Sequence, residues 1–256
     1  SINMQSVSNF NRNLVIFLVS LALINLAIGF YKSFNKSKES STTQINYKVK
    51  NLNVKNSDTN GMSVDYISRA NEMLEIFKKY NFSVDRFLKD ESANLIIFSS
   101  LPDDFMEIQP VNERKKLFIN TLLPIIYAEN LKILEDRKKI LDWWSESQGE
   151  NFSRDFWPAW LFELSEKYDA ADSNLGNLLI KVDVIPISMA LSQAAIESGW
   201  GTSRYLREGN AVYGQYTVEK NKGIEPAKRD SSQKFFIRKF ENLSESTKSY
   251  FKNINT

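Results

Sequence analysis

The sequence predicts a mainly helical protein with a small β-hairpin lobe, preceded by a single N-terminal transmembrane helix. Three observations predict this organisation. Residues 14–31 form a long apolar run, and the polar stretch 32–60 separates this run from the rest of the chain. Beyond residue 60, apolar residues recur mostly at helical spacing, but this periodicity disappears between Tyr213 and Phe240.

After a short flank at residues 1–13, the run 14–31 is interrupted only by Ser20, Asn25 and Gly29. Its length is close to the ~20 residues that cross a bilayer core, so we expect a membrane anchor or an uncleaved signal. A cleavable signal peptide and a buried soluble helix are the alternatives. The run is longer than the roughly 7 to 15 apolar residues usual in a signal peptide, which favours the anchor.

Residues 32–60 are rich in Ser, Asn, Lys and Thr and contain few large apolar side chains. Such a segment does not bury enough surface to fold, so we expect a flexible linker with a reach of roughly 30 Å. The remaining chain is long enough for a sizeable core. We expect a helical subdomain at 61–180, followed by a second region at 181–256.

Helical periodicity predicts helices at 62–81, at 111–147 and from Arg154 to Tyr168. We expect a break near Pro124, because proline lacks the N–H group that a helix interior needs. The apolar segment 93–100 fits either a strand or a buried helix. A further strand is expected at Lys234–Arg238, with turns at Gly214 and Gly223.

The most informative residue is Glu197, which ends the apolar segment that begins at Pro186 and precedes the glycine-rich turn Ser198–Gly201. The C-terminal end of a helix and apolar neighbours such as Ile196 and Trp200 both favour the protonated carboxyl group. A protonated Glu is a general acid. The alternative is an exposed glutamate that pairs with Arg204 or Arg207.

The composition excludes several kinds of chemistry. The chain has no Cys and no His, which excludes thiol nucleophiles, Ser-His triads, imidazole-ligated zinc and disulfides. Carboxylate chemistry remains, and we expect no cofactor. The formal net charge of +2 gives no electrostatic reason to expect nucleic acid as a partner.

Three linked motifs carry a resemblance to a known family: Glu-Ser-Gly-Trp-Gly-Thr-Ser-Arg at 197–204, Gly-Asn-x-x-Tyr-Gly-Gln at 209–215, and Ile-Arg-Lys-Phe at 237–240. In this combination the chain resembles Bax-type proteins of the bacterial glucosaminidase superfamily, with a mannosyl-glycoprotein endo-beta-N-acetylglucosaminidase-like domain. The resemblance covers roughly residues 62–256. It implies a lysozyme-like α+β fold and cleavage of a β-1,4 bond beside N-acetylglucosamine in peptidoglycan, with Glu197 as the catalytic acid.

The resemblance also implies a second carboxylate from the β lobe, which falls on Glu225, with Glu219 and Asp230 as its neighbours. The alternative for Glu225 is a solvated charge in a loop rich in Lys and Glu. Catalysis would then use the N-acetyl group of the substrate as the nucleophile, with a single protein acid. The distance between two carboxylates separates these chemistries, and a sequence does not contain it.

Aromatic and amide side chains near Glu197 suit sugar binding, because rings stack on sugar faces and amides bind N-acetyl groups. The predicted substrate-binding residues are Trp200, Asn210, Tyr213, Gln215, Tyr216 and Tyr250. The alternative for each aromatic residue is core packing. Asn210 also suits the left-handed turn that would end a short helix at 203–208.

The predicted function is therefore that of a peptidoglycan hydrolase acting on glycan strands. It would be anchored in the inner membrane with its catalytic region in the periplasm, or exported after signal cleavage. Flanking charges oppose this topology, because Arg12 alone precedes the run whereas Lys32, Lys36 and Lys38 follow it. The alternatives are a lytic transglycosylase and a non-catalytic wall-binding or morphogenesis module. The resembling family continues beyond residue 256, which suggests a truncated C-terminus.

Overall fold

A computed structural model of the chain describes residues 62–89, 95–147, 153–171, 174–226 and 235–256. These residues belong to one compact unit, Asp58–Thr256. The predicted anchor at 14–31 and linker at 32–60 lie outside the described residues. The predicted boundary at 180/181 stays a prediction, although helices from both sides of it pack together, as described below.

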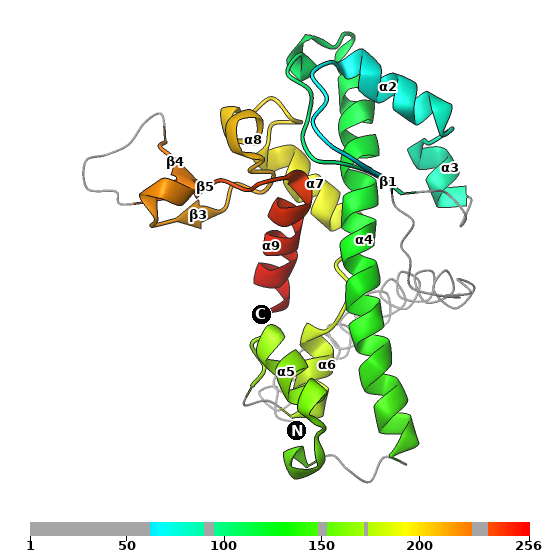
Figure 1. The fold of residues 1–256 in the computed structure, drawn as a ribbon, viewed down its shortest axis with the longest axis vertical. Helices are drawn as coiled ribbons and strands as arrows, with labels where there is room; N and C mark the ends of the chain where they lie inside the picture. Colours follow the sequence, from blue (N-terminus) through cyan, green and yellow to red (C-terminus); the bar gives the residue numbers. More distant parts are fainter. Residues whose placement is uncertain (1–61, 90–94, 148–152, 172–173, 227–234) are drawn as a thin grey trace, which may run out of the picture. The chain divides into compact units, whose positions relative to one another are not determined.

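Helix α4, Val111–Glu146, is the longest described element and the centre of the core (Figure 1). Its middle turns, from Leu117 to Ile126, are almost entirely buried, as expected of a helix enclosed by other elements. By length and composition α4 is also apolar enough to cross a membrane, but 67% of its most apolar window is buried inside the protein. We interpret α4 as a core helix.

The predicted break near Pro124 is wrong, because α4 continues through this residue. A proline in a helix interior removes one backbone hydrogen bond and crowds the preceding turn. Pro124 is buried between Leu123 and Ile125, which are each 1% exposed. Tertiary packing around these side chains therefore maintains the helix where the local sequence favours a break.

The N-terminal segment combines two short strands with two helices. Strand β1, Met62–Val64, pairs in parallel with β2, Ile96–Phe98, in the register Met62 to Ile96. Helices α2, Ala70–Lys79, and α3, Val84–Lys89, lie between these strands in the sequence. The predicted helix at 62–81 is therefore correct only from residue 70, because pairing with β2 holds residues 62–64 extended. The segment 93–100 contains a strand, not a helix.

Two small helices follow α4: α5, Ala159–Lys167, and α6, Leu175–Lys181. The helix predicted from Arg154 begins later than expected. A short 3₁₀ turn, η2, occupies Arg154–Phe156, and Trp157 is extended immediately before Pro158. Proline disfavours the helical conformation of the residue before it, so Trp157 stays extended and α5 begins only after Pro158.

The C-terminal region contains α7, Ile187–Glu197, α8, Arg204–Gly209, and α9, Leu243–Asn255. Both α7 and α9 pack on α4. The side chain of Asn130 in α4 accepts a hydrogen bond from the Ile185 N–H at 2.9 Å and donates to the Ile185 carbonyl at 2.8 Å. This clamp fixes the chain two residues before α7 begins.

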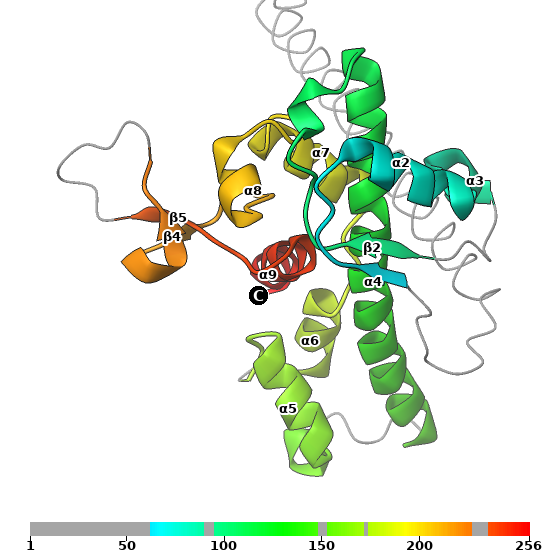
Figure 2. The same cartoon turned by 45° about the horizontal axis from the view of Figure 1, so that its top comes forward.

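The β lobe is a three-stranded antiparallel sheet in the order β3–β5–β4, more than the single hairpin expected. Its strands are β3, Tyr216–Thr217, β4, Gly223–Ile224, and β5, Phe236–Arg238. The short 3₁₀ turn η3, Lys220–Lys222, precedes β4. In both views the sheet lies on the same side of α4 as α7, α8 and α9 (Figures 1 and 2).

Gly223 lies in β4 and not in the predicted turn. A Cβ atom at Gly223 would approach the Cβ of Phe236 in the paired strand to 2.3 Å, a contact that a side chain does not tolerate. Gly214 has φ +61° and directly follows a turn at residues 212–213, next to the predicted position. The described residues thus confirm a mainly helical fold with a small sheet.

Candidate active site

Glu197 is the last residue of α7, and the following turn is held by its own backbone and side chains. The Ser198 hydroxyl donates to the Ala194 carbonyl at 2.6 Å and accepts from the Gly201 N–H at 3.1 Å. Gly199, Trp200 and Gly201 all have positive φ values. A Cβ on Gly201 would lie 2.5 Å from the Phe105 ring, so this close approach requires glycine.

Glu197 opens onto a pocket of about 520 Å³. Glu197 forms one part of the lining, and the rest comes from the β lobe, the segment that leads into it and α9. The lining residues are Glu197, Tyr213, Gly214, Gln215, Tyr216, Arg238 and Asn253. The structure therefore brings together four of the predicted site residues, Glu197, Tyr213, Gln215 and Tyr216.

The Glu197 carboxylate is exposed, and no described residue forms an ion pair or a hydrogen bond with it. Arg204, the expected alternative partner, instead lies 3.5 Å from Glu208. We expected Ile196 to shield the carboxyl group from water. This prediction is wrong, because Ile196 is itself 72% exposed. The side chain of Ile196 consequently leaves the carboxylate in contact with solvent.

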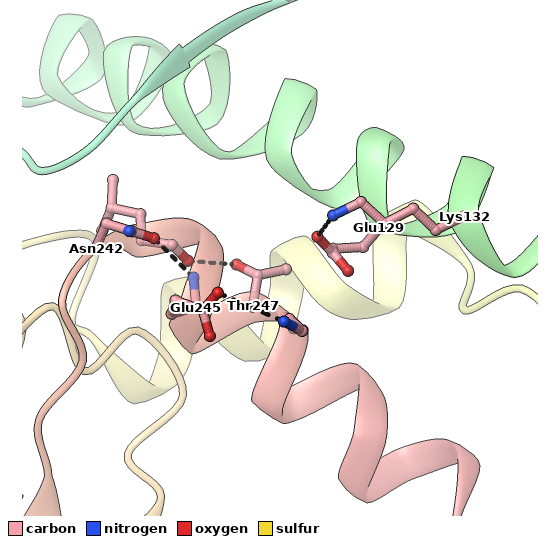
Figure 3. Close-up of polar contacts among 7 residues, drawn as sticks. Glu129, Lys132, Asn242, Glu245 and Thr247 are labelled. Carbon is pink, nitrogen blue, oxygen red and sulfur yellow. Dashed lines mark hydrogen bonds and ion pairs between the residues drawn. The ribbon is translucent and has the colours of Figure 1, made fainter. Parts of the chain in front are cut away.

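Tyr213 and Tyr250 stack face to face beside the pocket, with ring centroids 3.9 Å apart and an interplanar angle of 5°. Both rings are buried, and neither hydroxyl has a hydrogen-bond partner among the described residues. The nearby Thr247 hydroxyl of α9 donates to the Leu243 carbonyl at 2.9 Å (Figure 3). Burial raises the pKa of Tyr213 and also that of Tyr250.

Gln215 and Tyr216 offer the pocket a polar group and an aromatic surface. The Gln215 side chain donates to the Ser249 hydroxyl at 3.2 Å, while its Oε1 atom is buried without a partner among the described residues. Tyr216 is 67% exposed and packs edge-on against Phe235, with 4.9 Å between ring centroids. The exposed ring is therefore held in place by a neighbour and free to contact a ligand.

Four predicted site residues lie outside the pocket lining: Trp200, Asn210, Glu225 and Tyr250, whose ring stacks on Tyr213. The Trp200 ring packs edge-on against Phe118 at 5.9 Å, under the ammonium group of Lys115 at 4.7 Å. Asn210 adopts φ +51°, the left-handed turn considered as its alternative role, and its amide donates to the carbonyls of Phe240 and Glu241. Their roles as sugar contacts stay predictions.

Glu225, the expected second carboxylate, is an exposed residue just after β4 and does not line the pocket. Its backbone carbonyl accepts a hydrogen bond from Arg204 at 2.6 Å. Glu219 lies 2.8 Å from Lys222 in an ion pair, and Asp230 lies outside the described residues. Among the described residues that line the pocket, Glu197 is the one carboxylate.

Sequence reasoning missed three lining residues, Gly214, Arg238 and Asn253. Gly214 and Arg238 lie within the motifs that carry the family resemblance, so the motifs contained a signal for both. Asn253, near the end of α9, had no such signal. No cluster of three or more acidic, Cys or His side chains suited to a metal occurs in the described part of the chain.

The part of the chain that forms this pocket resembles the glucosaminidase family. Residues 174–256 match the glucosaminidase family, described as mannosyl-glycoprotein endo-beta-N-acetylglucosaminidase. The chain is also 31% identical over 175 residues to Protein bax of Escherichia coli (strain K12). That alignment covers 66% of this chain and 60% of the relative's length.

These two matches confirm the resemblance, seen in the motifs, to the Bax-type proteins of the bacterial glucosaminidase superfamily. The family match begins just before α6 and contains every lining residue of the Glu197 pocket. No solved structure matches the chain significantly.

Proposed function

We propose that this chain is a peptidoglycan hydrolase of the endo-β-N-acetylglucosaminidase type, with Glu197 as its general acid. The observation that carries the proposal is the Glu197 carboxylate, which has no partner among the described residues and opens onto a pocket between α7 and the β lobe. A helix that ends in the acid opposite a small sheet also supports a lysozyme-like arrangement. The glucosaminidase family match supports a glycan substrate.

In this mechanism Glu197 donates its proton to the leaving glycosidic oxygen. A sugar ring stacks on the exposed face of Tyr216, and the Gln215 amide, which lines the pocket, binds an N-acetyl group. Because Glu197 is exposed in the free protein, the bound sugar must itself exclude water from the carboxyl group. The bound substrate thus provides the water-free surroundings that Glu197 lacks in the free protein.

The pocket lining bears on the nature of the second catalytic group. Retaining and inverting glycosidases use two carboxyl groups about 5 to 9.5 Å apart, whereas substrate-assisted enzymes use the N-acetyl oxygen as the nucleophile. Because Glu197 is the one carboxylate among the described lining residues, we favour the substrate-assisted route. Glu225 would have to move toward the pocket to act.

The same observation favours one alternative, a lytic transglycosylase. Such an enzyme also needs a single carboxyl group but closes the sugar on itself to an anhydro end, without adding water. The two activities place the same proton on the same oxygen, so the pocket geometry supports both. Their products differ in mass by one water molecule.

The test is to incubate the full chain, in mild detergent, with purified peptidoglycan and to identify the products by mass spectrometry. Glu197→Gln should abolish cleavage, while the matched variant Glu208→Gln, whose partner is Arg204, should retain it. Reducing-end N-acetylglucosamine products support the hydrolase, and anhydro products support the transglycosylase. Wall binding without any cleavage would instead support a non-catalytic module.

We further propose that the protein acts in the cell envelope, anchored through residues 14–31 with the Glu197 pocket in the periplasm. The glucosaminidase domain supports this location, since the polymer that it would cleave lies there. The lysines after the apolar run oppose this orientation. Protease accessibility of the domain in spheroplasts measures the orientation directly.

A further inference from the structure

A second hollow, of about 460 Å³, adjoins the Glu197 pocket. Arg238 lines both hollows, and α9 supplies Asn253 to the first and Lys252 to the second. The other walls of the second hollow come from α4 and from Lys167 and Tyr168 at the end of α5. We call this second hollow the basic pocket, after the charges described next.

Five cationic and two acidic side chains line the basic pocket. The cations are Lys132, Lys167, Arg238, Lys248 and Lys252, and the acids are Glu129 and Glu245. Two of these cations pair with the two acids: Lys132 with Glu129 at 2.6 Å and Lys248 with Glu245 at 3.6 Å (Figure 3). The lining therefore carries an excess of positive charge.

The pairing leaves two cations available. Lys167 forms an ion pair at 2.5 Å with Asp136, which does not itself line the pocket. Arg238 and Lys252 form no ion pair with any residue that the structure describes. The Arg238 guanidinium group instead lies 5.1 Å from the Phe240 ring centroid, which orients it without neutralising it. An unpaired Arg and an unpaired Lys in one concave site are suited to bind carboxylates or phosphates.

We propose that the basic pocket binds the carboxylates of the peptide that N-acetylmuramic acid carries in peptidoglycan. This inference rests on the proposed function, because a glycan held at Glu197 would project its peptide substituent beside the sugar and thus into an adjoining site. Arg238, which lines both pockets, would contact the substituent where it leaves the sugar. Lys252 would bind a carboxylate further along the peptide.

Apolar side chains complete the match to a peptide. Ile133, Phe240 and Phe251 line the same hollow and suit the methyl groups of alanine residues. A cationic site that bound phosphate alone would not need these apolar side chains. The basic pocket would therefore make the protein select peptide-bearing strands over unsubstituted glycan.

The experiment compares intact peptidoglycan strands with strands from which an amidase has removed the peptides. Binding by co-sedimentation and cleavage by product analysis are measured for the full chain and for two variants. Lys252→Gln alters the basic pocket alone, and Lys220→Gln removes an exposed lysine from η3, outside both pockets. The wild type should prefer intact strands, and Lys252→Gln should weaken their binding about fivefold, the size expected of one partly exposed charge pair. Lys220→Gln should behave as wild type.

A third arm identifies the anion. Free stem peptide should compete for binding, and inorganic phosphate at equal ionic strength should not. Competition by phosphate alone, or equal binding of both strand types by the wild type, would overturn the proposal. An equal loss on both strand types in Lys252→Gln would also overturn it. If neither strand type is cleaved but the binding preference and its loss in Lys252→Gln persist, the basic pocket is supported and only the proposed catalysis fails.

Discussion

The carboxylate of Glu197 lies directly against the backbone of Gly214. A Cβ atom placed on Gly214 would approach Glu197 Oε2 to 3.1 Å, and Gly214 has φ +61°, a conformation that other residues rarely adopt. The end of α7 and the entrance to the β lobe thus meet at the one carboxylate that is described in the pocket lining. Gly214 therefore leaves room for the Glu197 carboxylate, which a side chain at this position would crowd.

Replacing Gly214 with alanine should therefore impair catalysis more than folding. The strained backbone should lower the free energy of unfolding by about 1 kcal/mol. Displacement of Glu197 should reduce turnover roughly 10- to 100-fold. Urea denaturation and peptidoglycan turnover measure the two effects. Gly176→Ala, in α6 and without a positive φ, is the control and should keep full activity. Equal turnover in the two variants would contradict the contact.

The Asn130 clamp should contribute strongly to stability, because its amide satisfies both backbone groups of Ile185. Asn130→Ala removes two hydrogen bonds and leaves buried groups unpaired, which should lower the free energy of unfolding by about 2 to 4 kcal/mol. Asn112→Ala, an exposed change in the same helix, should alter it by less than about 0.5 kcal/mol. Similar denaturation midpoints for both variants would show that the clamp is dispensable.

Stability should decrease at alkaline pH because of the buried tyrosines. Burial raises the pKa of Tyr213, so the native state keeps this proton while the unfolded chain releases it near its ordinary value of about 10. The free energy of unfolding should be insensitive to this group below about pH 10 and should fall as the pH rises further. Tyr213→Phe should flatten this fall, as measured by urea denaturation between pH 8 and 11. An unchanged slope would rule out this contribution.

Trp200 and Tyr216 should respond differently to truncation. The Trp200 ring packs against Phe118, so Trp200→Ala should lower the free energy of unfolding by about 2 kcal/mol. Tyr216 is exposed in the pocket, so Tyr216→Ala should cost less than about 1 kcal/mol but raise the KM for glycan several-fold. If Trp200→Ala raised KM at unchanged stability, Trp200 would be a sugar contact after all.

The sequence predicted the features of the site that are local in the chain. The helix that ends at Glu197 followed from apolar spacing after Pro186, and the left-handed Asn210 followed from its place after a short helix. Each depends on residues within a few positions, whose backbone preferences are strong. The family resemblance depended on these same short motifs.

Long-range pairing explains where the sequence predictions failed. Residues 62–64 have a helical pattern but are extended because β2 pairs with them from more than thirty positions away. Pro124 was expected to break α4, yet burial among core side chains outweighs the lost hydrogen bond. In both cases a distant partner decides the conformation, and no local pattern contains that partner.

The sequence by itself made Glu197 the candidate for carboxylate chemistry, because the chain lacks His and Cys and ends one apolar helix with this acid. Only the tertiary structure decided which residues face that acid. The packing of α9 on α4 and the pairing of β5 with β3 place Asn253 and Arg238 in the pocket, while Trp200 and Asn210 point into other contacts. The side chains that line the pocket come from distant segments of the chain, and the packing of helices and strands decides which of them meet.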